Sequence, residues 1–251
     1  MRIKDIKARM ILDSRGYPTV ECDILLDQGI MGRAAVPSGA STGANEALEL
    51  RDHGEEFFGK GVETAVNNIK NVIRGSVLDK EFENFAEFDH ELIALDGTEN
   101  KSNFGANAIL AISLAFAKAE ALSKTIHFYE LFDGKPSLPK PMFNIINGGA
   151  HADNSLDTQE FMVMPQFDQY ERNLRAACEI TYSLKKLLKT KGYATNVGDE
   201  GGFAPDLRSD TEALDLIAEA VGAAGYKFGK EVYICLDVAA SEIFSEKKYH
   251  F

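Results

Sequence analysis

Two glycine-rich stretches carry acidic side chains in a pattern that suits acid–base chemistry. The first runs from Asn147 to Glu160 and contains His151, and the second runs from Val197 to Pro205 and contains Glu200. Glycine allows the backbone to adopt positive φ and to come close to a ligand. An ordinary surface turn seldom needs several glycines, so two such stretches in one chain are unusual. Acids held on such loops at the end of an α/β sheet are a usual setting for metal-assisted proton transfer. The two stretches therefore predict an enzyme.

The segment that must position these loops alternates short apolar runs with helical patterns. The short apolar runs at 142–146 and 161–164 each indicate a buried strand or the start of a helix, and the periodicity over 170–188 predicts a helix that Gly192 ends. A capping-box pattern at 209–212 opens a second helix. The unbroken apolar run 232–237 is typical of a parallel strand buried on both faces, with Asp237 at its carboxyl end. This order favours a (β/α) barrel with acids at its strand ends.

The first third of the chain reads instead as a small α+β unit. Apolar alternation predicts strands over 4–12, 20–26 and 30–36 as an antiparallel meander, the middle one half-buried. The loop 37–43 follows, with nothing to pin it into a core. Helical spacing over 62–73 predicts a helix for which Gly75 is a plausible end, and the run 107–123 predicts a buried helix.

Composition excludes several classes of protein. The chain has 251 residues, is 45% hydrophobic and 26% charged, and carries a formal charge of −12. That charge disfavours nucleic acid and anionic lipid as partners, and no apolar run reaches the ~18 residues of a membrane span. Three scattered cysteines and no signal sequence indicate a reducing, cytoplasmic compartment. Clustered carboxylates suit Mg²⁺, which an anionic substrate would need as an intermediary.

Three prolines at 136–141 predict a domain boundary, with domains at 1–134 and 141–251. A full barrel takes about 250 residues. The second domain has far fewer, so we expect an incomplete barrel, or a chain that is part of a longer protein. The strand with Tyr233 and Cys235 would then have an unpaired apolar edge. Such an edge predicts an oligomeric or unstable chain, or one complemented by a second polypeptide.

Six motifs, in order along the chain, together resemble the enolase family. They cover residues 13–21, 37–52, 102–108, 147–160, 198–202 and 236–242. The resemblance implies an N-terminal α+β domain followed by the opening portion (ββααβ) of a TIM-like (β/α)8 barrel, incomplete in this chain. It also implies two Mg²⁺ ions, a homodimer or larger assembly, and the reversible dehydration of 2-phosphoglycerate to phosphoenolpyruvate in glycolysis.

The resemblance assigns a role to each site residue. Glu200 is the implied general acid that protonates the departing hydroxyl, and Glu160 is the neighbour that helps to place it. His151 is the implied loop histidine that moves toward the substrate, and Gln159 lines the site. Asp237 is the implied first carboxylate ligand of one Mg²⁺, and Ser41 the lid ligand of the second. The family's other two carboxylate ligands and its lysine base lie on later strands, so we expect the chain alone to be inactive.

Plainer interpretations of the same residues stay open. Asp237 could only cap a strand, Glu200 could begin a helix, and His151 could serve loop hydrogen bonding alone. The stretch 38–43 could be a flexible linker. Asp199 is expected to have no catalytic role. The alternative function is a non-catalytic interaction or scaffold protein derived from an enolase, against which the retention of all six site residues argues.

Overall fold

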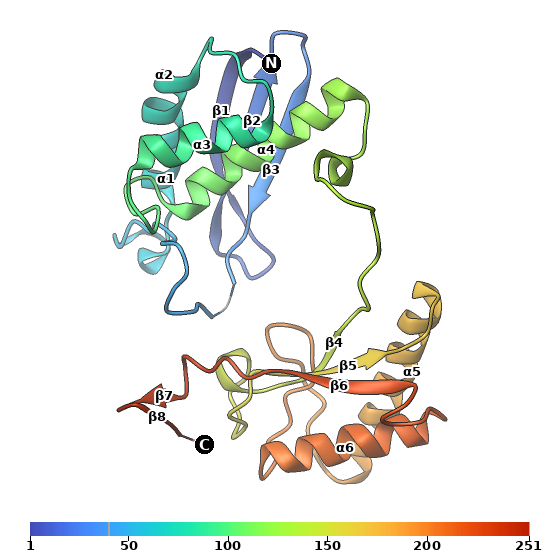
Figure 1. Ribbon diagram of the computed structural model, residues 1–251. Coiled ribbons are helices and arrows are strands. Elements are labelled where there is room, and N and C mark those ends of the chain that lie inside the picture. Colours follow the sequence, from blue (N-terminus) through green and yellow to red (C-terminus); the bar gives the residue numbers. More distant parts are fainter. Residues whose placement is uncertain (40, 251) are drawn as a thin grey trace. The chain divides into compact units, whose positions relative to one another are not determined.

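The computed structural model describes residues 1–39 and 41–250, so Ala40 of the predicted loop and Phe251 lie outside the described residues. The chain divides into two compact units (Figure 1). Unit 1 comprises residues 1–39 and 45–136, and unit 2 comprises residues 137–250 with the short segment 41–44. Each unit has a hydrophobic core of its own.

A three-stranded antiparallel sheet forms one layer of unit 1. Its strands are β1 (Ile3–Leu12), β2 (Pro18–Leu26) and β3 (Met31–Val36), in the order β1-β2-β3. The predicted meander is confirmed. Val20, Cys22, Ile24 and Leu26 are fully buried on the core face, as a period of two requires.

The expectation that β2 is half-buried is wrong, because its other face is covered as well. Asp23 on that face is only 6% exposed. Arg33 of β3 donates from Nε to Asp23 Oδ1 at 2.6 Å, and Arg9 of β1 donates to Asp23 Oδ2. Two guanidinium groups from the flanking strands thus enclose a carboxylate at the centre of the sheet.

Helices form the second layer of unit 1. The first runs without interruption through α1 (Glu63–Asn67), the π-helical stretch η2 (Asn68–Ile73) and α2 (Arg74–Val77). Gly75 lies inside it, so the prediction that Gly75 ends this helix is wrong; the helix ends where Leu78 becomes extended. The other elements are η1 (Glu56–Gly59), α3 (Phe85–Asp96), α4 (Ala106–Lys124) and η3 (Phe128–Leu131).

Helix α4 is the predicted buried helix. It packs against β2 and β3, and its residues at helical spacing, among them Ala108, Ala111, Ile112, Ala115 and Phe116, are completely buried. By length and composition alone it is also apolar enough to cross a membrane, the one such helix in the described part of the chain. Its packing is that of a core helix, so it does not contradict the expectation that the chain has no membrane span.

Unit 2 contains the predicted ββααβ order. Its main elements are β4 (Phe143–Asn147), β5 (Glu160–Pro165), α5 (Tyr170–Thr190), α6 (Asp210–Ala223) and β6 (Val232–Asp237). A short turn η4 (Gly149–His151) follows β4, and a small hairpin of β7 (Phe244–Ser245) and β8 (Lys248–Tyr249) follows β6. Helix α5 packs on β5 and on α6. The Ser209 hydroxyl caps α6 by accepting from the amide of Glu212, as predicted.

The sheet of unit 2 corrects one prediction about β6. Its order is β4-β5-β6, and β5 is antiparallel to both neighbours. The apolar run 232–237 therefore does not pair as a parallel strand, and it is not buried on both faces: Tyr233 is 44% and Leu236 43% exposed. Since β4 and β6 point the same way, their carboxyl ends meet the start of β5 at one edge of the sheet.

The enclosed carboxylate of Asp23 makes the stability of unit 1 depend on pH. Its hydrogen bond from Arg33, followed by that from Arg9, lowers the pKa of Asp23 from 3.8 to about 2 against the opposing effect of burial. A depressed pKa stabilises the folded state above the unfolded pKa, and this contribution is lost as the pH falls from about 4 towards 2. We expect Asp23→Asn to lower the free energy of unfolding by about 2 kcal/mol at pH 7.

Urea unfolding followed by circular dichroism between pH 2 and 7 measures this effect. The difference between Asp23→Asn and the wild type should shrink steadily below pH 4. The exposed Asp27→Asn is the matched control and should change little at any pH. A constant difference across the range would show that the lost stability comes from packing and not from the charge.

Candidate active site

The register of the sheet in unit 2 places three polar residues in one row. Asn147 at the end of β4 pairs with Glu160 at the start of β5, and Glu160 pairs with Asp237 at the end of β6. Cα partners in adjacent strands carry their side chains on the same face, close enough to interact. Two of the predicted site residues, from segments 77 positions apart, are thus brought together by backbone pairing alone.

Burial and like charges act on the Glu160 carboxyl. Its side chain is 20% exposed. Burial is the main cause that raises the pKa of Glu160, the negative charges of Asp237 and Glu200 raise it further, and His151 opposes the shift. Because the charges of Asp237 and Glu200 both reach Glu160, all three predicted carboxylates share one electrostatic environment.

Gln159 and His151 complete the contacts around the row. Gln159 is 4% exposed and donates from Nε2 to Asp237 Oδ2 at 3.3 Å. His151, on the turn η4, is 6% exposed, and its Nδ1 lies 3.3 Å from Glu160 Oε1. That separation permits electrostatic contact, but Nδ1 and Oε1 are not aligned as a hydrogen bond, so Nδ1 has no hydrogen-bond partner.

Glu200 lies on a tight loop that is fastened to the same strands. The amide of Gly198 donates to the Gly202 carbonyl at 2.9 Å, and the amide of Asp199 donates to the His151 carbonyl at 3.2 Å. A Cβ on Gly202 would lie 2.0 Å from Asn147 Oδ1, and one on Gly198 would lie 2.5 Å from the His151 carbonyl oxygen. These two glycines are required by close approach, and Glu200 is exposed on a loop that is not the start of a helix.

Several buried polar atoms at this edge of the sheet have no partner. They are Asn144 Oδ1, Asn147 Nδ2, His151 Nδ1 and Gln159 Oε1. A buried polar atom without a hydrogen bond costs about 1–3 kcal/mol, and native proteins contain few of them. Four in one place, beside three carboxylates, are the arrangement expected of a site that completes its hydrogen bonds with a polar ligand.

The described residues do not by themselves make a magnesium site. Within residues 1–39 and 41–250, no group of three His, Cys, Asp or Glu side chains is placed to hold a metal ion. Asp237 already accepts from the amide of Ala239 at 3.0 Å and from Gln159. This part of the chain thus offers one predicted carboxylate ligand, which falls short of the oxygen ligands that Mg²⁺ requires.

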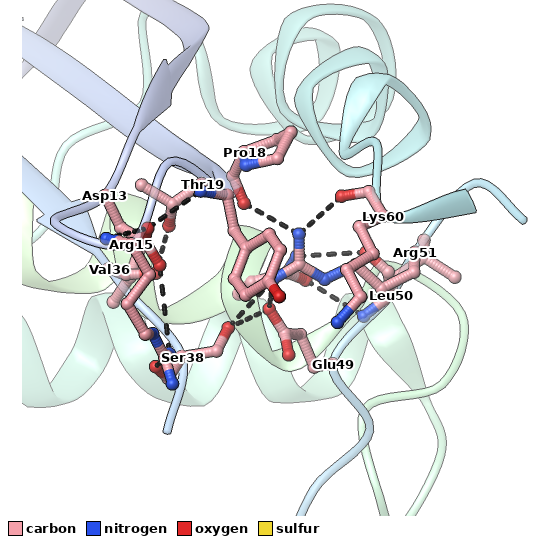
Figure 2. Close-up of polar contacts among 12 residues, drawn as sticks. Asp13, Arg15, Pro18, Thr19, Val36, Ser38, Glu49, Leu50, Arg51 and Lys60 are labelled. Atoms are coloured by element: carbon pink, nitrogen blue, oxygen red, sulfur yellow. Dashed lines mark hydrogen bonds and ion pairs between the residues drawn. The ribbon is translucent and has the colours of Figure 1, made fainter. Parts of the chain in front are cut away.

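The loop that carries Ser41 is anchored at its start, which corrects the expectation that nothing pins it. Figure 2 shows Ser38 surrounded by polar contacts within unit 1. The Arg15 guanidinium donates to the Ser38 carbonyl at 2.6 Å, Arg51 donates to the Ser38 hydroxyl at 3.1 Å, and that hydroxyl donates to Glu49. The position of Ser41 relative to the acids of unit 2 stays a prediction.

Two residues that organise these loops have no role predicted from the sequence. Asn147 is fully buried, accepts from Asn144 Nδ2 at 3.0 Å, and lies where the Gly198–Gly202 loop comes closest. Arg51 is 16% exposed and donates to the carbonyls of Pro18 and Lys60 at 2.7 and 2.6 Å. Both belong to recognised motifs, but their importance depends on contacts with distant segments, which no local pattern indicates.

Family models match nearly the whole chain. A model described as the N-terminal domain of enolase matches residues 3–132, and one described as the C-terminal TIM barrel domain of enolase matches residues 135–251.

The contacts of Arg51 predict its contribution to stability. Arg51→Met removes the four hydrogen bonds that Arg51 donates to the carbonyls of Pro18 and Lys60, the Ser38 hydroxyl and the Glu49 carboxylate (Figure 2). Unpaired polar groups then stay partly buried, so we expect unit 1 to lose about 2–4 kcal/mol of unfolding free energy.

The exposed ion pair of Arg2 and Asp79, with atoms 3.5 Å apart, supplies the control. Arg2→Met should cost less than about 1 kcal/mol, as is usual for surface pairs. Urea unfolding of both variants gives the comparison. Equal small losses would show that Arg51 does not anchor the loop.

Proposed function

Because the chain belongs to the enolase family, we propose that the edge of the β4-β5-β6 sheet is the acid–base part of a site that reversibly dehydrates 2-phosphoglycerate to phosphoenolpyruvate. The observation that carries the proposal is the grouping of Glu160, Asp237 and Glu200 around buried polar atoms that lack partners. Membership of the family supports a lyase-type enzyme, and the substrate and the role of each residue belong to the proposal.

In the proposed reaction a base removes the proton on the carbon next to the substrate carboxylate, and in the family this base is a lysine on a later strand. The electron pair left on that carbon forms the new double bond as the carbon–oxygen bond breaks, and the hydroxyl leaves as water. The hydroxyl takes the bonding electron pair and needs a proton, which Glu200 supplies from its exposed position on the Gly198–Gly202 loop. Glu160 holds its proton more readily than an ordinary glutamate because its pKa is raised. It can therefore donate a hydrogen bond to the same oxygen while Glu200 transfers its proton.

The remaining predicted residues orient the substrate. His151 and Gln159 each present a buried polar atom without a partner, and both adjoin the row of carboxylates. The correct substrate can make hydrogen bonds to these atoms, whereas an analogue without the matching polar groups would leave them unpaired. The site therefore favours the correct substrate. Enolases typically use Mg²⁺, and Asp237 and Ser41 stay the proposed ligands in this chain. A cytoplasmic location, a glycolytic role and a homo-oligomer belong to the same proposal.

The test is turnover by the product of the complete reading frame, whatever its length, with 2-phosphoglycerate and Mg²⁺. Absorbance of the enol product follows the reaction. Glu200→Gln removes the proton donor but keeps the shape, so kcat should fall by about 10²–10⁴-fold. Asp199→Asn, on the neighbouring exposed residue, is the matched control and should stay within a few-fold of the wild type.

Two results would contradict the proposal. Turnover that survives in Glu200→Gln would remove the general acid from the scheme. Folded protein without turnover in the wild type would favour the alternative, a non-catalytic scaffold derived from the family. The 251-residue chain assayed alongside, which we expect to be inactive alone, tells whether its own residues suffice.

A further inference from the structure

Unit 1 contains a groove between α3 and α4 that the proposed chemistry does not use. Its volume is about 300 Å³, near the lower end of the range for small-molecule sites. Helix α4 contributes four residues at helical spacing, and helix α3 contributes two residues one turn apart. Its lining is Ala47, Asp89, Ile93, Lys101, and from α4 Ala106, Ile109, Leu110 and Ser113.

The walls of the groove are apolar and open to solvent at the rim. Ile93 is 46% exposed and Leu110 is 48% exposed, although both belong to helices that bury their other faces in the core. Exposed aliphatic side chains that face each other across a groove lose unfavourable contact with water when a hydrocarbon group enters. The walls thus suit a short aliphatic chain.

Asp89 gives this groove a half-buried carboxylate, whose charged form the Ser113 hydroxyl and His90 favour. Its Oδ1 is buried and makes no hydrogen bond to any described residue. Burial raises the pKa of Asp89, and the neighbouring Ser113 hydroxyl opposes the shift. A carboxylate oxygen is held out of water at the cost of its solvation, and that cost is recovered only by a donor or a positive charge.

Lys101, a positively charged residue that lines the groove, already has a hydrogen-bond partner of its own. The Lys101 ammonium donates to the backbone carbonyl of Glu99 at 2.9 Å. A further donor, to Asp89 Oδ1, would therefore come from outside the described residues. A carboxylate at an apolar groove is complementary to a cation on a hydrocarbon stem.

We propose that the α3–α4 groove is a binding site for a small primary amine, whose ammonium group contacts Asp89 while its alkyl chain lies between Ile93 and Leu110. The site is separate from the proposed catalytic row, since all its residues belong to unit 1. Binding there needs no substrate, so it is independent of whether the chain is active.

The test is an NMR titration of the 251-residue chain, labelled with ¹⁵N, with n-hexylamine as the probe. Amide shifts should change over residues 85–113 and saturate with a Kd of about 1 mM, as for a ligand of this size. n-Hexanol and hexanoate at equal concentration test the charge and should bind at least about tenfold more weakly.

Two variants measure separately what the charge of Asp89 and the apolar walls contribute to binding. Asp89→Asn keeps the shape and should weaken the binding of n-hexylamine at least tenfold, while melting at the wild-type temperature or above because a buried charge is removed. Leu110→Gln, at a half-exposed position, should also weaken it. Glu99→Gln lowers the net negative charge near the groove by the same amount and should leave the affinity unchanged.

Three results would overturn the proposal: no saturable shift up to about 20 mM n-hexylamine, equal binding of n-hexanol, or unchanged affinity in Asp89→Asn. Each is read on folded protein, which the amide spectrum itself establishes. None of them bears on turnover at Glu200, so the failure of this proposal and that of the proposed function stay distinguishable.

Discussion

The antiparallel pairing of β5 with both of its neighbours is the constraint on which the site in unit 2 depends. It aligns Asn147, Glu160 and Asp237 although long segments of chain separate them. A shift of one residue in either pairing would turn the row to opposite faces of the sheet. The register is held by the core below it, where Ile146, Phe161 and Val163 pack with the helices α5 and α6. The chemistry at the edge thus rests on apolar packing in the interior.

The polar edge of this sheet is destabilising when considered alone. Buried atoms of Asn144, Asn147, His151 and Gln159 lack partners, and burial disfavours the ionised form of Glu160. Glycines at 198 and 202 allow the loop with Glu200 to come as close as it does, and glycine costs conformational entropy on folding. Such local costs are common at sites that bind ligands, since a ligand then supplies what the protein lacks. Unit 1 shows the opposite case at Asp23, where two arginines fully satisfy a buried carboxylate.

Sequence patterns predicted the elements well and their partners less well. Period-two alternation located β1 to β3, and helical spacing located α4 and α5, because these signals depend only on which face of each element is buried. The order ββααβ was implied by the resemblance to the enolase family and is confirmed. The prediction that β6 pairs as a parallel strand was wrong. An apolar run indicates that a strand is at least partly buried, but it does not show which neighbouring strand it pairs with or in which direction. Gly75 was misplaced as a helix end because neighbouring residues continue the helix through it.

Among the site residues, too, some could be predicted from local motifs and others could not. Glycine-rich loops with acids made Glu160 and Glu200 candidates, and the resemblance to the enolase family gave them and Asp237 their expected roles, which stay predictions. Asn147 and Arg51 were not predicted, because their roles come from contacts with the Gly198–Gly202 loop and with Ser38, which are set by the tertiary fold. The enclosure of Asp23 was missed for a similar reason: Arg9 and Arg33 reach it only once three strands are in register.

The site in unit 2 requires that Glu160 lies within the electrostatic reach of Asp237 at the edge of the sheet. Carbon-13 NMR of the Glu160 carboxyl as a function of pH, in the wild type and in Asp237→Asn, measures this interaction. The predicted result is a pKa above the ordinary glutamate value in the wild type that falls in the variant, because a like charge has been removed. An ordinary pKa that is the same in both proteins would contradict the row of carboxylates and the site built on it.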